Sequence, residues 1–120
     1  MRAVRGATSV GEDTREAILR STAELVREVL DRNGLAADDL ISIIFTMTPD
    51  LHAEFPAVAA REIGLSHVPL ICAAELEVPG ALPMCIRLML HCQMPADRRV
   101  RHVYLRDARK LRPDLEGAAQ

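Results

Sequence analysis

Residues 13–47 read DTREAILRSTAELVREVLDRNGLAADDLISIIFTM, and the two halves of this stretch decide the class of fold. In the first half, apolar side chains over residues 18–30 recur at the i, i+3, i+4 and i+7 spacing of an amphipathic helix. Asp13, followed three positions later by Glu16, is expected to cap the start of that helix. Asn33 and Gly34 are expected to end it.

The second half of the stretch, residues 40–47, is an apolar, β-branched run that predicts a buried strand. Pro, Gly and polar turns divide the rest of the chain into similar short elements. These are a strand at 2–7, a helix at 57–63 that begins after Pro56, a strand at 68–73, a helix at 82–92 and a strand at 100–105. The predicted order is β-α-β-α-β-α-β, an α+β fold with a mixed sheet packed against helices. Such a small sheet leaves an apolar face open, which favours oligomerisation.

The length of 120 residues indicates one domain, which we place at residues 1–115 and follow with a disordered tail at 116–120. The net charge of -2 gives no general attraction to nucleic acid or to a membrane surface. The aromatic content of 2% argues against binding of RNA or single strands by base stacking. Residues 98–112 hold seven basic side chains against one acid, which we interpret as a solvated basic edge, with a nucleic-acid patch as the alternative.

The cysteines and the hydropathy of the chain bear on its location. Cys72, Cys85 and Cys92 form no C-x-x-C pair and lie in apolar surroundings, a pattern typical of reduced thiols. No apolar run reaches the roughly 18 residues that a membrane span needs. The first expected strand follows the amino terminus directly, without a signal-peptide pattern. A cytoplasmic protein is therefore expected.

Several kinds of reaction chemistry have no motif in this sequence. There is no Gly-rich phosphate loop and no Ser-His-Asp pattern. The four histidines are widely separated, so their spacing gives no support to a metal site. We therefore expect neither a metal nor a cofactor.

One arginine has an unusual setting. Arg87 is the single formally charged residue between Val78 and Ala96, and its nearest neighbours are apolar. Because desolvating an unpaired charge is costly, it needs a carboxylate from elsewhere or an anionic ligand, unless it is simply exposed on a half-buried helix. Glu75, which follows the strand expected at 68–73, could accept a hydrogen bond from a ligand hydroxyl or could pair with an arginine.

Arginines recur at expected strand ends or among apolar residues, namely at Arg5, Arg61, Arg87 and Arg112. A guanidinium presents a planar fork to carboxylates and stays protonated at neutral pH. Several converging arginines would suit a small polyanion better than they would suit acid–base catalysis.

Six short motifs occur in register from Val4 to Leu115, which is nearly the whole chain. They are Val4-Arg5-Gly6-Ala7-Thr8, Thr48-Pro49-Asp50-Leu51-His52-Ala53, Phe55-Pro56-Ala57, Cys85-Ile86-Arg87, Arg101-His102-Val103-Tyr104-Leu105 and Leu111-Arg112-Pro113-Asp114-Leu115. Together they resemble the monofunctional chorismate mutases of the Bacillus type. Each motif alone is weak, but six in order and at suitable spacing are highly specific.

The resemblance implies a homotrimer that looks like a pseudo-α/β barrel, with active sites in clefts between adjacent subunits. It implies conversion of chorismate to prephenate, the committed step toward phenylalanine and tyrosine, by a one-step pericyclic (Claisen) rearrangement. That reaction needs no nucleophile, proton shuttle, metal or cofactor. It needs a site that selects the compact conformer of chorismate and stabilises the charge that separates as the C–O bond breaks.

The resemblance also implies roles for residues. Arg87 would donate to the ether oxygen, and Glu75, helped by Cys72, would engage the ring hydroxyl. The other expected substrate contacts are Arg5 and Tyr104 on the side-chain carboxylate, Arg61 and Arg112 at the mouth of the site, and Phe55, Ala57 and Leu70 along its wall. Val58, Ile71 and Leu76 depart from the pattern of the family, which bears on affinity more than on the reaction.

Three other functions are kept as alternatives. A different small-molecule enzyme on a similar trimeric scaffold, such as an enamine/imine deaminase, would not need Arg87, Glu75 and Arg112 together. A non-catalytic module that senses a carboxylated metabolite would use the same arginines without turnover. Nucleic-acid binding through residues 98–112 would weaken steeply with salt.

Overall fold

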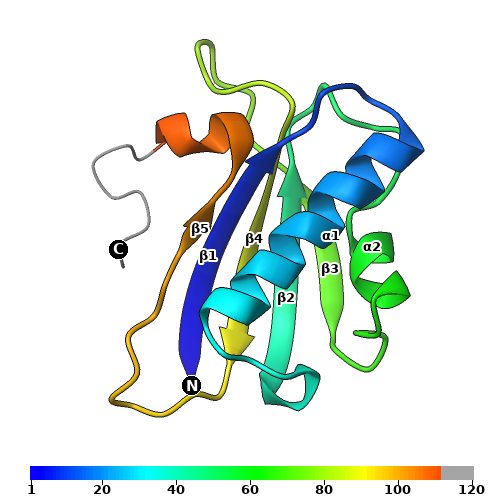
Figure 1. Ribbon diagram of the computed structural model, residues 1–120. Helices are drawn as coiled ribbons and strands as arrows, with labels where there is room; N and C mark the ends of the chain where they lie inside the picture. The colour runs from blue at the N-terminus through cyan, green and yellow to red at the C-terminus, as the bar shows by residue number, and fades with distance from the viewer. Residues whose placement is uncertain (112–120) are drawn as a thin grey trace.

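The computed structural model describes residues 1–111, so Arg112 and the tail expected at 116–120 lie outside the described residues. The described chain forms a five-stranded sheet with two α-helices on one of its faces (Figure 1). The strands are β1 (Arg2–Ser9), β2 (Leu40–Met47), β3 (Leu70–Ala74), β4 (Cys85–Cys92) and β5 (Val103–Tyr104). The helices are α1 (Arg15–Arg32) and α2 (Ala57–Glu62), with short 3-10 helices η1 (Ala37–Asp39) and η2 (Arg106–Leu111).

The sheet is mixed, as predicted, with the strand order β3-β2-β4-β1-β5. Strand β4 lies at its centre and pairs antiparallel with both β1 and β2. The two outer pairs, β1 with β5 and β2 with β3, are parallel. The predicted α+β class is therefore confirmed, and β4 brings residues from the last third of the chain between two early strands.

The helix predicted at 82–92 is wrong, because this segment forms β4 from Cys85 to Cys92. Its exposure alternates with a period of two, so that Ile86, Leu88 and Leu90 are buried while the residues between them are half-buried. Strand β4 has a neighbouring strand on each side, and Met89 adds an apolar residue on the face opposite the helices, so the apolar residues also fit helical spacing in this short run. The element order is thus β-α-β-α-β-β-β, apart from the two 3-10 helices.

The core lies between the sheet and the two α-helices, and Phe45 is its one aromatic side chain within residues 1–111, whereas Tyr104 is buried in a separate small cluster with Ala7 and Ala108. Helix α1 packs closely on β1 at Gly6. A Cβ atom at this glycine would lie 3.1 Å from a Val29 methyl, 3.2 Å from Leu25 and 3.3 Å from Leu88. The missing side chain therefore sets how near the helix can approach the sheet.

The predicted cap of α1 is off by one residue. Thr14, not Asp13, is the N-cap, and its hydroxyl accepts a hydrogen bond from the Ala17 N–H at 3.2 Å. The Asp13 carboxylate instead accepts from the backbone N–H groups of His52 and Ala53, at 2.9 and 3.0 Å. Asp13 therefore holds the loop that follows β2.

Other boundaries also shift. Strand β3 begins at Leu70 rather than at residue 68, and β5 is reduced to Val103–Tyr104 within the strand predicted at 100–105. After β5 the chain forms η2, a short helix that the sequence did not predict. No helix within residues 1–111 is long and apolar enough to cross a membrane.

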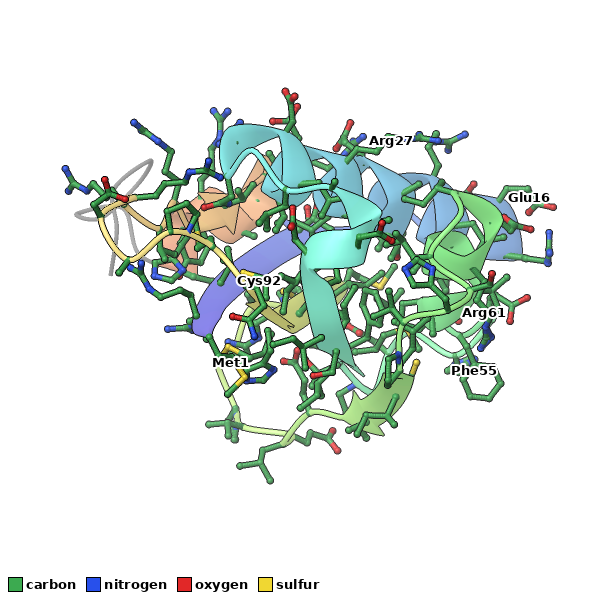
Figure 2. All side chains as sticks on the ribbon, turned by 90° about the horizontal axis from the view of Figure 1, so that it is seen from below. Met1, Glu16, Arg27, Phe55, Arg61 and Cys92 are labelled. Carbon is green, nitrogen blue, oxygen red and sulfur yellow. The ribbon has the colours of Figure 1, made fainter. Side chains whose placement is uncertain are left out.

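The sheet face opposite the α-helices carries polar and apolar side chains together. Register places Arg5, Thr46, Arg87 and Met89 on this face, because directly paired residues share a side of the sheet. Viewed from below, the two α-helices cover the opposite face (Figure 2). The edge strand β3 adds Ile71, whose exposed fraction is 62%.

Candidate active site

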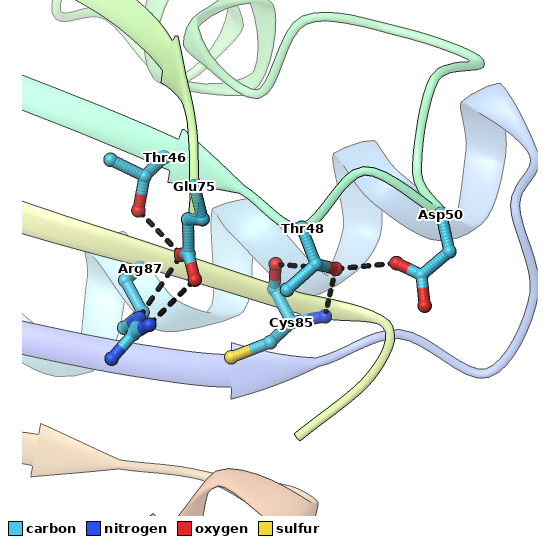
Figure 3. Close-up of polar contacts among 6 residues, drawn as sticks. All are labelled: Thr46, Thr48, Asp50, Glu75, Cys85 and Arg87. Atoms are coloured by element: carbon cyan, nitrogen blue, oxygen red, sulfur yellow. Dashed lines mark hydrogen bonds and ion pairs between the residues drawn. The ribbon is translucent and has the colours of Figure 1, made fainter. Parts of the chain in front are cut away.

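Arg87, in the middle of β4, is paired with Glu75, the first residue after β3. Its Nε lies 3.0 Å from one carboxylate oxygen of Glu75 and its Nη2 lies 2.6 Å from the other (Figure 3). This two-pronged geometry matches the planar fork of the guanidinium to both oxygens. The partner that a cation in an apolar segment requires is therefore this carboxylate.

Thr46 is a third member of this cluster, because it binds the Glu75 carboxylate. The sequence did not point to Thr46 as a site residue. Its hydroxyl donates to Oε2 of Glu75 at 2.6 Å, and β2–β4 register sets Thr46 directly opposite Arg87. The backbone N–H of Glu75 donates to the Met47 carbonyl at 2.9 Å, which extends the β2–β3 pairing by one residue. A signal was present, since Thr46 and Ser42 are the two polar residues of an otherwise apolar run.

Both members of the pair are held in their ionised forms. Burial opposes the ionisation of Glu75, but the hydrogen bonds from Arg87 and Thr46 outweigh it and lower the pKa of the carboxyl. The hydrogen bond to Glu75 raises the pKa of Arg87. The Glu75 side chain is only 7% exposed whereas that of Arg87 is 41% exposed, so the guanidinium is the more accessible member of the pair.

Tyr104 and Arg5 lie on the same face as Arg87. Ala7 pairs with Arg87 across β1–β4 and with Tyr104 across β1–β5, so the three residues form one row across the sheet. The Tyr104 hydroxyl is buried and has no hydrogen-bond partner among residues 1–111. Buried hydroxyls usually have a partner, so this one keeps an unused capacity for a hydrogen bond within residues 1–111.

Cys85, two residues before Arg87, provides no nucleophile. Burial, followed by the nearby charge of Glu75, raises the pKa of its thiol to about 11. The thiol therefore stays protonated at neutral pH. Within residues 1–111 no three His, Cys, Asp or Glu side chains are grouped closely enough to hold a metal ion.

The other expected site residues lie at a different part of the surface, around α2 and the edge strand. Phe55 is 64% exposed and, with Cys72, lines a pocket of about 330 Å³ next to the end of β2. Arg61 is exposed on α2, at the same end of the molecule as Phe55 (Figure 2). Ala57 is buried in the core at the start of α2.

The structure does not bring Cys72 to the Arg87 face. Cys72 pairs with Phe45, which is fully buried, and both Cys72 and Leu70 pack against the core beneath the helices. Neighbouring side chains on a strand point to opposite faces, so Ala73, not Cys72, shares the face of Thr46. The expected site residues of one chain thus fall into two groups, one around Arg87 and one around Phe55, while Arg112 lies outside the described residues.

Comparison with known proteins identifies the family to which the chain is similar. A family model described as "Chorismate mutase type I" matches residues 1–115. The chain is 51% identical over 121 residues to chorismate mutase AroH of Thermus thermophilus, covering 98% of both proteins. It is 44% identical over 118 residues to chorismate mutase AroH of Bacillus subtilis, covering 96% of this chain and 92% of that protein.

A solved structure agrees as well. The chorismate mutase from Clostridium thermocellum superposes on this chain with a TM-score of 0.89 at 46% sequence identity. The match covers 92% of this chain and 99% of the other.

Proposed function

The chain belongs to the type I chorismate mutases, which are isomerases, and from this premise we propose that Arg87 and Glu75 form the centre at which chorismate rearranges to prephenate. The observation that carries this proposal is the Glu75-held guanidinium of Arg87, whose outer edge is accessible. The proposed pathway is the biosynthesis of phenylalanine and tyrosine.

The rearrangement of chorismate does not require a side chain to act as a general acid or base. In a [3,3] rearrangement the ether C–O bond breaks while a new C–C bond forms, and no proton is transferred. Negative charge grows on the ether oxygen as the bond breaks. A rate enhancement of about a millionfold requires the site to lower the barrier by roughly 8 kcal/mol.

Arg87 supplies a donor at the ether oxygen. Its guanidinium is already fixed by two hydrogen bonds to Glu75, so it need not reorganise when charge develops. A cation among apolar residues interacts more strongly with that charge than a cation in water does. Glu75 holds Arg87, and its carboxylate is also the proposed acceptor for the ring hydroxyl of chorismate.

Other residues are needed to bind the two carboxylates of chorismate and to hold it in the compact conformer. Arg5 and Tyr104 orient the side-chain carboxylate, and the Tyr104 hydroxyl, unpaired within residues 1–111, supports this assignment. Arg61 and Arg112 attract the dianion at the mouth of the site. The aromatic ring of Phe55 and the wall that it forms with Ala57 and Leu70 favour the compact conformer.

We further propose that each site is shared by two subunits of a homotrimer. The group around Phe55 and Arg61 lies near the β3 edge, while Arg87 and its neighbours line the face opposite the helices. One chain therefore does not present both groups to one substrate. A second copy whose Phe55 group faces the Arg87 group of the first would complete the site, and it would also cover Ile71, which is 62% exposed.

The test is the loss of chorismate absorbance in the ultraviolet after addition of the purified protein. Wild type is expected to consume chorismate rapidly, and Arg87→Ala is expected to reduce turnover by at least about a hundredfold. Arg20→Ala removes an exposed arginine of α1 and serves as the matched control. Tight binding of chorismate by folded wild type without turnover would instead favour a metabolite-sensing module.

A further inference from the structure

The segment that follows β2, at Thr48 and Asp50, is hydrogen-bonded to the start of β4. The proposed roles of Arg87 and Glu75 do not account for these contacts. The Thr48 hydroxyl accepts a hydrogen bond from the Cys85 N–H at 3.0 Å and donates to Asp50 Oδ1 (Figure 3). The other oxygen of the Asp50 carboxylate accepts from the Met84 N–H at 2.9 Å. Thr48 and Asp50 therefore connect the loop after β2 to Cys85, the first residue of β4, and to Met84, which precedes it.

Met84 has a backbone conformation that a residue with a side chain adopts at a cost. Its φ is +53°, in the left-handed region that favours glycine. Both of its backbone polar groups are held, since the N–H donates to Asp50 and the carbonyl accepts from the Val10 N–H at 2.8 Å. The Asp50 carboxylate is thus one of two contacts that stabilise this turn.

The turn bears directly on the Arg87–Glu75 pair. Residues 75–84 connect Glu75 to the start of β4, and both ends of this connection are fixed by residues 46–50. Thr46 and Met47 hold the Glu75 end through its carboxylate and its N–H. Thr48 and Asp50 hold the other end, three residues before Arg87.

We propose that Asp50 is a positioning residue, which keeps Met84 in its left-handed conformation and thereby sets Arg87 and Glu75 at the geometry the rearrangement needs. This inference rests on the proposed roles of Arg87 and Glu75. Asp50 itself contacts neither of them in the described structure, so it acts through the backbone of β4 and not through substrate.

The test is a double-mutant cycle with Asp50→Ala, Met84→Gly and the double variant. Asp50→Ala is expected to lower kcat by about ten- to a hundredfold with a smaller change in KM, because a displacement near 1 Å is enough for such a loss. Met84→Gly removes the cost of the left-handed turn, so the double variant is expected to recover most of that loss. Asp50→Asn keeps an acceptor for the Met84 N–H and is expected to lose less than Asp50→Ala.

Glu77→Gln is the matched control, because Glu77 is an exposed carboxylate that lines the same shallow pocket as Asp50. It is expected to leave kcat unchanged. Such a result would show that the loss in Asp50→Ala comes from the lost contact with Met84 and not from the removal of a negative charge nearby. Wild-type kcat in Asp50→Ala would overturn the proposal, and so would a loss that Met84→Gly does not relieve. Should Asp50→Ala fail to fold, the pair Asp50→Asn and Asp50→Asn/Met84→Gly supports the same comparison.

A second readout does not depend on turnover. The side-chain ¹⁵Nε–H resonance of Arg87, identified by its absence in Arg87→Ala, reports the hydrogen bond to Glu75. It is expected to shift in Asp50→Ala and to return toward its wild-type position when Met84→Gly is added. An inactive wild type with this response would refute the proposed function alone, whereas an active wild type without it would refute the positioning role.

Discussion

At the scale of single residues, the central feature is a cation in one strand, Arg87, whose partner is the first residue after another strand. Arg87 and Glu75 are twelve residues apart in the chain and are joined by two hydrogen bonds, with Thr46 bonded to the same carboxylate. Breaking such a pair leaves a partly buried charge without its partner, which is costly. The geometry of the pair therefore matters for folding as well as for turnover.

Arg87→Lys tests whether the fork geometry matters beyond the charge. Lysine keeps a positive charge but offers one ammonium group in place of two aligned N–H donors. We expect kcat to fall by about a hundredfold or more, with the helix and strand content by circular dichroism unchanged. Near-normal kcat in this variant would remove Arg87 from the proposed mechanism.

Tyr104→Phe tests whether the buried hydroxyl of Tyr104 contributes to substrate binding and not to the stability of the free protein. The Tyr104 hydroxyl has no partner within residues 1–111, so its removal is expected to raise the free energy of unfolding by about 1 kcal/mol. The same change is expected to raise KM, because a contact with the substrate carboxylate is lost.

Thr22→Val is its control, since Thr22, in α1, has the other buried hydroxyl without a partner in the described chain. It is expected to raise stability similarly and leave KM unchanged, as judged from urea unfolding and initial rates. A stability loss in Tyr104→Phe would show that the hydroxyl is bonded in the free protein.

At the scale of elements, the position of α1 on the sheet is set by a glycine. Gly6 faces three buried side chains, two on α1 and one on β4. A Cβ atom added at Gly6 would lie only 3.1–3.3 Å from them. Gly11, by contrast, has nothing within 4 Å of such an atom. The two glycines therefore differ in packing and not in φ, since neither has a positive φ.

We expect Gly6→Val to lower the free energy of unfolding by about 2 kcal/mol, because α1 must move away from β1 to accept the new side chain. Gly11→Val adds the same atoms where space is open and is expected to change it by less than about 0.5 kcal/mol. Urea unfolding at one fixed protein concentration measures both, since association adds a dependence on concentration. Equal midpoints for the two variants would contradict the packing account.

At the scale of the whole molecule, the two groups of expected site residues become parts of one site only if chains associate. This makes a trimer with shared sites testable by mixing two defective variants. Arg87→Ala damages the sheet-face half of every site, and Arg61→Ala damages the α2 half. In a mixed trimer, some sites take an intact half from each kind of chain.

Random reassembly of the two variants at equal amounts is expected to restore roughly a quarter of the sites, and turnover should recover in proportion. Reassembly is done by joint unfolding and refolding, with each variant refolded alone as the control. Sedimentation measures the mass of the assembly. Activity that stays at the level of the separate variants would show that one subunit forms its own site.

The sequence predicts some elements of the fold correctly and others not. The pattern over residues 18–30 identified α1, and the apolar run at 40–47 identified β2, because both are local periodicities. The segment at 82–92 was predicted as a helix, because its apolar residues fit either period and only its pairing with β1 and β2 makes it a strand. Thr14 replaced Asp13 as the cap because Asp13 is engaged by the distant loop at His52.

The sequence by itself determined the family, because six motifs occur in register, and it singled out Arg87 as a cation among apolar residues that needs a partner or an anionic ligand unless it is exposed. Only the tertiary structure decided which groups meet. It joined Arg87 to Glu75 and Thr46 across three strands, turned Cys72 toward the core, and brought Asp50 to Met84. The physical reason is that strand pairing and register act between segments far apart in the chain, whereas propensity and periodicity act within a few residues.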